Sequence, residues 1–285
     1  MPNPAAEPRR QVPRVADNRA HGLIEAGFVR VGARTEILGP YETGGYRLRL
    51  PRSRGRFCEA VIVNTGGGMA GGDHAGFVFS ASDGAAVTLT TTAAEKIYRG
   101  RHADGANGVS HIDVAIELAR GATLDWVPQE TILFDGARLD RRLSVEMAPD
   151  ADLLVAEMLV FGRLAMGERV NSGSLRDRWR LRRGGRLVLA EDLALGGDVA
   201  GLLDRPALGD GGRASATVVL VSPHAEALID QARAALAVHD VVGGVSAWNG
   251  MLVARSISLS PERLRAANVA LLSGLRGCAL PRLWT

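Results

Sequence analysis

Short runs of apolar and β-branched residues, separated by tight turn signals, dominate most of the chain. Residues 77–80 and 87–92 flank the turn signal Asp83-Gly84-Ala85, and the same order of strand, turn and strand recurs further on. The later copies are 112–118 with 123–127, 143–147 with 153–160, and 179–181 with 187–190. Their turns are spaced by roughly 30 to 37 residues, which is typical of stacked units that bury their apolar faces against one another. We therefore predict a mainly β fold, a layered or helical stack of antiparallel strand-turn-strand units.

Helical spacing of apolar residues appears in two places near the end of the chain. Ser222-Pro223 precedes one pattern at 224–238, and Ser260-Pro261-Glu262 opens the other. Serine is a preferred N-cap and proline a preferred first helical residue, so both positions predict helix starts. Between the two helices, Asn249-Gly250 predicts the turn of a β-hairpin.

These patterns divide the chain into three parts. Residues 1–20 are rich in Pro, Arg and Ala and are predicted to be a disordered lead-in. Residues 21–203 form a β-rich main body, and residues 204–285 form an α+β C-terminal portion that packs on the body. The loop at 203–213, which contains Pro206 and several Gly and Asp residues, is the expected boundary.

The composition fits a folded globular protein and narrows its partners. The chain has 285 residues, 46% of them hydrophobic and 23% charged, with a net charge of +3. All of its 34 basic residues except Lys96 are arginines, and aromatic residues make up only 5%. Because the arginines are interleaved with acidic residues and few aromatic rings can stack on bases, nucleic acid is not an expected partner.

The cysteines, histidines and apolar runs suggest no tightly bound cofactor. Cys58 and Cys278 lie far apart and belong to no Cys/His cluster, so neither a disulfide framework nor a structural zinc site is indicated. A reduced, cytoplasmic location is therefore expected. No apolar run reaches the length of a membrane span, and we expect no membrane partner. The histidines lack metal-site spacing and no hydrolase signature is present, so no catalytic residue is nominated.

A glycine run at 64–73 invites comparison with a phosphate-binding loop. Such a loop needs a helix N-terminus after it, and the P-loop form also needs Gly-Lys-Ser/Thr. Neither is present, because the run follows the strand-like residues 60–63 and leads into 77–80. We interpret the run as backbone that turns sharply or packs closely, with Asp73 displayed at its end. A nucleotide-binding enzyme that uses this run is the less favoured alternative.

Residues 124–139 combine a strand-like pattern with residues that a core strand avoids. Pro128 and the acidic residues Glu130 and Asp135 interrupt an apolar and β-branched run. Because proline removes a hydrogen-bond donor from the ladder, the segment predicts an edge strand, a bulge or a bend. The two carboxylates are then either solvated or held for a purpose.

Several segments together resemble the urease accessory proteins called UreD, or UreH in some species. Residues 64–73 resemble the family's TxGGxxGGD segment, 92–99 its TxxAxKxYR segment and 124–137 its LEWLPQExIxFxGA segment. Residues 161–163 with 167–168, and the closing 281–285, are similar to its GRxxxGE and PRIW elements. The resemblance runs from about residue 22 onward, and so many motifs in the same order are not expected by chance.

The resemblance implies a non-enzymatic, mainly β scaffold for urease maturation. Proteins of this family bind apo-urease on one side and UreF on the other, and UreF recruits UreG, a GTPase that carries nickel. The assembly delivers Ni²⁺ to the buried urease site, and the scaffold offers the ion an internal, water-filled path. Nickel would thus be cargo in transit, and acidic residues would line the path.

The family motifs carry three path carboxylates over to Asp73, Glu157 and Glu191 of this sequence. The last two lie in strongly apolar strands, where a carboxylate is costly to bury unless it is paired, hydrated or on a channel. Weak, incomplete coordination suits a path, because a tight site would trap the ion. Each carboxylate could instead form a structural ion pair with an arginine. A free-standing nickel-binding protein with a tight site is the alternative function.

Two positions depart from the family pattern. Asn64 stands where many relatives have histidine, which argues against an imidazole ligand there. Glu95 occupies a position that is usually small and neutral or hydroxylic, and it could form a local salt bridge with Lys96.

Overall fold

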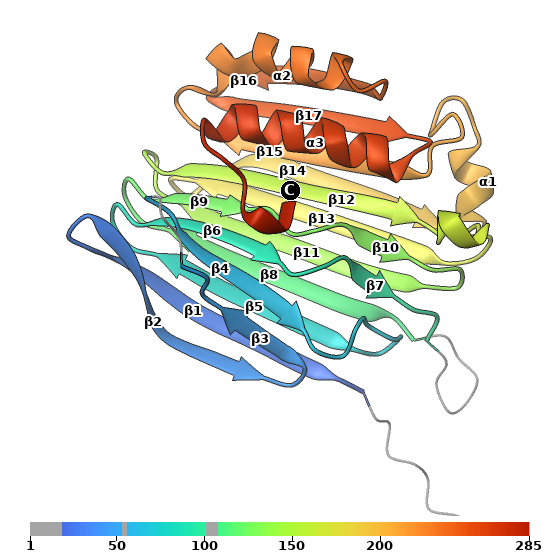
Figure 1. Cartoon of the computed structure of the whole chain (residues 1–285), viewed down its shortest axis with the longest axis horizontal. Coiled ribbons are helices and arrows are strands. Elements are labelled where there is room, and N and C mark those ends of the chain that lie inside the picture. The colour runs from blue at the N-terminus through green and yellow to red at the C-terminus, as the bar shows by residue number, and fades with distance from the viewer. Residues whose placement is uncertain (1–18, 53–55, 101–107, 285) are drawn as a thin grey trace, which may run out of the picture.

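The computed structural model describes residues 19–52, 56–100 and 108–284. These residues form two β-sheets, and the colour gradient in Figure 1 shows the chain progressing from one end of the molecule to the other. The disordered lead-in predicted at 1–20 lies almost entirely outside the described residues. None of the helices in the described ranges is long and apolar enough to cross a membrane.

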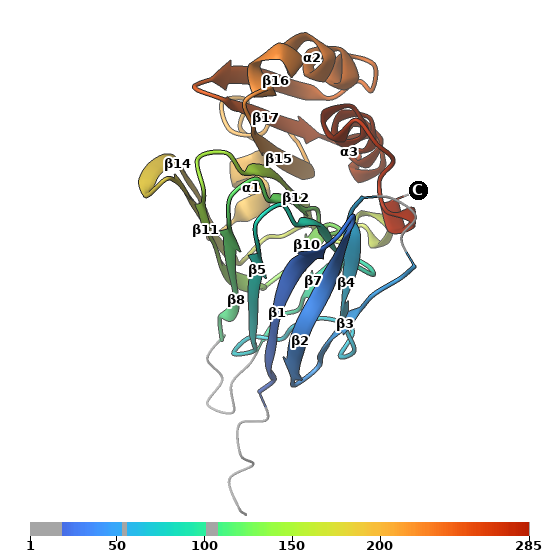
Figure 2. The same cartoon turned by 90° about the vertical axis from the view of Figure 1, so that its left-hand side faces the viewer.

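We call the seven-stranded sheet "sheet A" and the ten-stranded sheet "sheet B". In spatial order, sheet A consists of β14 (Arg186–Gly196), β13 (Ser174–Arg183), β11 (Arg138–Met147), β8 (Ser110–Leu118), β5 (His74–Ala81), β1 (His21–Val31) and β2 (Arg34–Thr43). Sheet B consists of β16 (Val242–Trp248), β17 (Met251–Ser258), β15 (Ala214–Val221), β12 (Asp152–Phe161), β9 (Thr123–Trp126), β6 (Ala86–Thr91), β4 (Cys58–Asn64) and β3 (Tyr46–Arg49), with β10 (Thr131–Leu133) pairing with β12 and with β7 (Glu95–Ile97). Figure 2 places β8 and β11 on one side and β4 and β10 on the other.

The four predicted strand-turn-strand units are present as β5–β6, β8–β9, β11–β12 and β13–β14, so the mainly β stack is confirmed. The expected antiparallel pairing within a unit holds only for the fourth, in which β13 pairs with β14. In the first three units, one strand lies in sheet A and the other in sheet B. These strands pair in parallel with their counterparts in the next unit, for example β5 with β8 and β6 with β9. The exception is β12, whose neighbour on that side is β15, in an antiparallel pairing.

The turn backbones explain this correction. In the first unit, the Gly84 amide donates to the Arg120 carbonyl of the next turn at 2.9 Å, and the Thr123 amide donates to the Ala85 carbonyl at 2.8 Å. Each turn is therefore satisfied by its neighbour instead of closing a hairpin. Gly84 adopts a φ of +68° at the corner, which glycine tolerates. The fourth unit is the last in the stack, so β13 pairs with its own second strand.

Alternate residues of both sheets point into the space between them and form the main core. Along β5, Phe77 and Phe79 are buried together with Ala75 and Ala81. The two phenylalanine rings lie 6.3 and 6.2 Å from the ring of Trp126, which belongs to sheet B. Because burial of apolar area stabilises by roughly 25 cal/mol per Å², these contacts clamp the two sheets together.

The C-terminal strands extend sheet B, and two helices cover its outer face. β15 pairs antiparallel with β12 and β17, and α2 (Ile229–Ala237) and α3 (Pro261–Arg276) pack on these strands in a second core. The two predicted helices are therefore confirmed. Ser260 caps α3 as predicted, because its Oγ accepts from the Arg263 amide at 3.2 Å. The first helix instead begins with a 3-10 turn at Ala225–Leu228. Asn249 and Gly250 both have positive φ, as the predicted hairpin turn requires.

Residues 124–139 contain the bend predicted from Pro128. β9 ends at Trp126 and β10 begins at Thr131, so the strand is interrupted where the proline stands. The two acidic residues of the segment, Glu130 and Asp135, each form an ion pair with an arginine. They are therefore held by partners within the chain.

The bend is fastened by residues near the end of the chain. The indole N–H of Trp284 donates to the Val127 carbonyl at 3.0 Å. Arg265 of α3 donates to the side chains of Gln129 and Glu130 at 2.7 and 2.8 Å, and its guanidinium carbon lies 4.9 Å from the Trp284 ring centre. We call this set of contacts the C-terminal latch. It brings two of the sequence motifs, 124–137 and 281–285, into direct contact.

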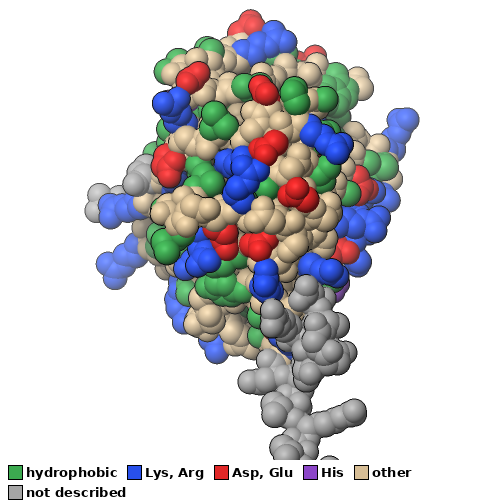
Figure 3. All heavy atoms as spheres, turned by 90° about the vertical axis from the view of Figure 1, so that its right-hand side faces the viewer, with side chains coloured by type: hydrophobic (Ala, Val, Ile, Leu, Met, Phe, Trp, Pro, Cys, Tyr) green, Lys and Arg blue, Asp and Glu red, His purple; other side chains and the backbone are tan. Residues whose placement is uncertain are grey.

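Acidic and basic side chains are interspersed on the face seen in Figure 3. This arrangement matches the near balance of 34 basic and 31 acidic residues in the sequence. Mixed charges of this kind cancel at a distance, so this face does not present a field of one sign.

Candidate functional site

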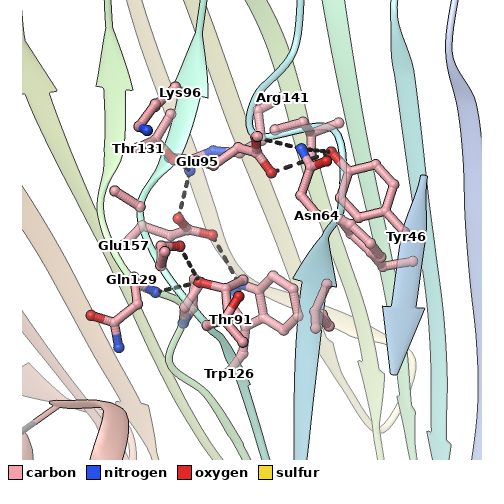
Figure 4. Close-up of a pocket in the computed structure, with 18 residues that line it drawn as sticks. Tyr46, Asn64, Thr91, Glu95, Lys96, Trp126, Gln129, Thr131, Arg141 and Glu157 are labelled. Atoms are coloured by element: carbon pink, nitrogen blue, oxygen red, sulfur yellow. Dashed lines mark hydrogen bonds and ion pairs between the residues drawn. The ribbon is translucent and has the colours of Figure 1, made fainter. Parts of the chain in front are cut away.

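Polar side chains collect in one zone between the two sheets, inside an otherwise apolar core. A cavity of about 120 Å³ lies in this zone and opens to solvent past the exposed residues Gly67 and Lys96. Its polar lining includes Tyr46, Asn64, Glu95, Thr131, Arg141 and Glu157. Figure 4 shows these residues approaching the cavity from strands of both sheets. Since buried polar groups are costly unless they have partners, their hydrogen bonds decide what the zone can do.

Glu157 belongs to a buried ionic triad with Arg141 and Asp177. Arg141 Nη1 lies 2.5 Å from Glu157 Oε2, and Arg141 Nη2 lies 2.5 Å from Asp177 Oδ2. The side chains of Arg141, Glu157 and Asp177 are only 3%, 5% and 7% exposed, respectively. The indole N–H of Trp126 completes the shell by donating to Glu157 Oε1 at 2.8 Å. The arginine ion pair that the sequence offered as an alternative for Glu157 is therefore present.

The triad carries two carboxylates for one guanidinium. Burial raises the pKa of Glu157, and this outweighs the lowering by the Arg141 charge. Burial opposes the charge on Arg141, but Asp177 and Glu157 together still raise its pKa, so the guanidinium stays protonated. One guanidinium cannot balance two ionised carboxylates, so the second negative charge has to be neutralised by a proton or by a further cation.

Glu95 lies at the other end of the cavity with different partners. Asn64 Nδ2 donates to Glu95 Oε1 at 2.8 Å, and the Tyr46 hydroxyl donates to Glu95 Oε2 at 3.2 Å. Burial raises the pKa of Glu95 to about 7, although these hydrogen bonds act against the shift. The same burial, together with the Glu95 charge, raises the pKa of Tyr46. Asn64 and Glu95, which both depart from the family pattern, are therefore direct partners.

The direction of Glu95 follows from the alternation along β7. Ile97 is buried in the main core, so Glu95, two residues earlier, also faces inward, whereas Lys96 between them is exposed. Figure 4 shows Lys96 directed away from the carboxylate. The salt bridge considered between Glu95 and Lys96 is not formed. Glu95 thus has no arginine or lysine partner among the described residues.

Glu191 lies on β14, at the edge of sheet A, and reaches across to sheet B. It forms an ion pair with Arg255 of β17. Arg255 is the register partner of Thr217, which is in turn the register partner of Glu157. Directly opposed residues share a face of the sheet, so one row of polar side chains leads from Glu157 in the interior to Glu191 at the rim. We call the zone from Glu95 through the triad to Glu191 the interior polar band.

The side chain of Asp73 accepts hydrogen bonds from the backbone. Its two carboxylate oxygens accept from the amides of Ala20 and Ala70 at 2.9 and 2.7 Å. Its charge contributes to the raised pKa of Tyr46, but it does not share a partner with Glu157 or Glu191. The three predicted carboxylates are therefore not gathered at one point. Across residues 19–52, 56–100 and 108–284, no three His, Cys, Asp or Glu side chains are placed to hold one ion.

The glycine run packs closely, as the sequence predicted. A Cβ atom on Gly71 would lie 2.4 Å from the Gly108 carbonyl oxygen, and one on Gly100 would lie 2.1 Å from Gly71. The run leads from β4 into β5, so the strand, loop, strand order is confirmed, and no helix follows it as a phosphate loop would need.

Sequence reasoning missed Arg141 and Asp177 and undervalued Glu95. A signal was present for the first two, because Arg141 alternates with Leu139 and Leu143, and Asp177 alternates with other buried residues of its strand. A charged residue at an apolar position of a strand predicts a buried ion pair. Glu95 lies on a strand of three residues, which is too short for any alternation to be read.

Comparison with known proteins gives a consistent result. A family model described as UreD urease accessory protein matches residues 20–285. A urease accessory protein UreD of Rhodopseudomonas palustris (strain BisA53) is 48% identical over 270 residues, covering 94% of this chain and 92% of that protein. Another, of Methylobacterium sp. (strain 4-46), is 48% identical over 283 residues, covering 97% and 96%. A third, of Azorhizobium caulinodans, is 44% identical and covers 98% and 99%. The similarity spans both sheets and the interior polar band.

Proposed function

The chain belongs to the UreD urease accessory protein family, and we propose that it is a non-catalytic, cytoplasmic scaffold for urease maturation. In this role it binds apo-urease and UreF, and through UreF the GTPase UreG. It assists the delivery of nickel to the urease active site, with nickel as cargo and no tightly bound cofactor. The family membership carries the proposal, and the interior polar band supports the part that concerns nickel.

We place the ion's route along the interior polar band. Nickel accepts oxygen ligands, and the band offers Glu95 without a cationic partner, the triad with two carboxyl groups for one guanidinium, and Glu191 at the rim. A cation passing Glu157 or Glu191 competes with an arginine for the carboxylate, which keeps its residence short. The charge of Asp73 acts on Tyr46 at one end of the band, and Asp73 is retained as a candidate for that end.

The proposal is tested by co-expressing the chain with apo-urease, UreF and UreG. Wild type is expected to co-purify with apo-urease and UreF, and Glu157→Gln and Glu191→Gln are expected to co-purify equally well. The amides keep the shape of the side chains but weaken cation binding, so nickel per urease should fall. Asp73→Asn tests the third candidate in the same way. Glu117→Gln, on the exposed outer face of β8, is the matched control and should leave the nickel content unchanged.

Each component of the proposal has its own contrary outcome. If the wild-type chain does not co-purify with apo-urease or UreF, the scaffold role is wrong. If complexes form but the interior variants load urease like wild type, the scaffold stands and the route is wrong. Thermal unfolding of each variant accompanies the assay, and a variant that loses nickel only because it unfolds supports a purely structural role for that carboxylate.

A further inference from the structure

Three histidines from three different strands stand side by side on the outer face of sheet A. His21 of β1 is the register partner of His74 of β5, and His74 is the register partner of His111 of β8. Their ring centres are 6.3 and 6.2 Å apart. We call these side chains the histidine row. No spacing along the sequence reveals it, because the three residues are brought together only by the parallel stacking of the units.

A carboxylate beside the row, that of Asp113, orients the imidazole of His74 for binding a ligand. His74 Nε2 lies 2.8 Å from Asp113 Oδ2, on the same outer face. A carboxylate that accepts from one ring nitrogen fixes the tautomer, leaves the lone pair of the other nitrogen available, and makes it more basic. His21 and His111 have no hydrogen-bond partner for their ring nitrogens in the described part of the chain. His74 and Asp113 are 44% and 43% exposed, so an ion can reach them from solvent.

The spacing of the rings is close to that of a shared ion. An ion held at about 2.1 Å by one nitrogen of each of two imidazoles, at a tetrahedral angle, places the ring centres about 5 Å apart. The neighbouring pairs in the row, at 6.3 and 6.2 Å, have to close by about 1 Å to share one. Imidazole is a preferred ligand of divalent zinc, copper and nickel and a poor one for magnesium or calcium.

We propose that the histidine row is a surface site for a late first-row divalent cation, held by His74 together with either His111 or His21. Water completes the coordination, because no three ligating side chains converge in the described residues. Two imidazoles and water give a weak, exchangeable site. Arg142, at 3.9 Å from Asp113, is an opposing charge that keeps the affinity modest. The site lies outside the interior polar band, and its existence does not depend on the proposed function.

The test is equilibrium binding of Ni²⁺ and Zn²⁺ to the full chain, purified without a polyhistidine tag. We expect saturable binding that weakens by at least about tenfold in His74→Asn, because every pairing in the row uses this ring. Asp113→Asn removes the carboxylate behind the ligand and should weaken binding by about tenfold. His224→Asn and His239→Asn, outside the row, are the matched controls and should bind like wild type. The nickel-edge X-ray absorption spectrum should show imidazole scattering.

The outcomes separate this site from the interior route. Binding that survives His74→Asn but is lost in Glu157→Gln would overturn the proposal, as would a spectrum without imidazole. Absence of saturable binding by the wild-type chain would overturn it as well. None of these results changes the expected co-purification with apo-urease and UreF, so the two proposals fail separately.

Discussion

Two glutamates, Glu157 and Glu95, line the cavity, and their bonding partners differ. Glu157 is paired with Arg141 at 2.5 Å and receives an indole N–H as well. Glu95 has only the neutral donors Asn64 and Tyr46. Burial raises the pKa of both carboxyl groups, and that of Glu95 to about 7, so near neutral pH Glu95 is divided between its acid and its carboxylate.

This difference in partners indicates which carboxylate can bind a cation without losing an ion pair. Glu157 is locked by a charge that must be displaced before another cation can bind. Glu95 can release a proton and accept a cation without breaking an ion pair. In the proposed route for a divalent ion, Glu157 would exchange its arginine partner for the ion, and Glu95 would exchange a proton for it.

Removing the charge at the triad should have the largest effect. Arg141→Met leaves Glu157 and Asp177 buried without a cation, so we expect the free energy of unfolding to fall by about 3 to 5 kcal/mol. Chemical denaturation measures this. Arg142→Met, the next residue on the strand and 54% exposed, is the matched control and should lower stability by less than about 1 kcal/mol. Equal losses in the two variants would show that the triad does not hold the sheets together.

Glu95 should make stability depend on pH. Its pKa is about 7 in the folded chain and about 4.3 when unfolded, so the folded state binds the proton more tightly. The stability it contributes is complete below about pH 4.3 and is lost as the pH rises through about 7. Glu95→Gln cannot ionise, so its free energy of unfolding, relative to that of wild type, should rise by about 2.5 kcal/mol between pH 5 and pH 8. Urea unfolding at both pH values checks this, and parallel curves would contradict it.

A smaller effect is expected from the hydroxyl that supports Glu95. Tyr46→Phe removes one donor to the carboxylate, so it should lower stability by about 1 kcal/mol at pH 8, and by less at pH 5, where Glu95 is protonated. Tyr98→Phe is the control, since its hydroxyl donates to the neutral Gly67 carbonyl at 2.9 Å. The loss of stability in Tyr98→Phe should be the same at both pH values. A pH-independent loss in Tyr46→Phe would show that the hydroxyl does not support the ionised form.

The sequence predicted the strands but not their partners. The runs at 77–80 and 87–92 were identified correctly, because alternation and turn signals are local. A turn such as Gly84 has the same composition whether it closes a hairpin or turns the chain into the opposite sheet. The choice depends on the hydrogen bond from its amide to Arg120, which belongs to the next unit and is not encoded locally.

The interior was predictable where a charge interrupts an apolar run. Glu157 was singled out for this reason, and its arginine partner was foreseen as a class of residue. The identity of the partner depends on which strands face each other across the core, as does the link from Glu191 to Arg255. Asp73 was selected by motif alone, and its carboxylate proves to accept two backbone amides.

The C-terminal latch can form only late in the synthesis of the chain. The Val127 carbonyl and the Trp284 indole that donates to it are separated by 157 residues. At typical rates of translation, the bend at Pro128 is therefore synthesised roughly 10 to 30 s before Trp284. During that interval the edge of the cavity formed by Pro128 and Gln129 lacks the latch and is held by earlier strands, for example through the bond from the Gln129 amide to Thr91 Oγ1. A bulky extension placed directly after Trp284 would act on the interior from a distance, by delaying or preventing this final closure.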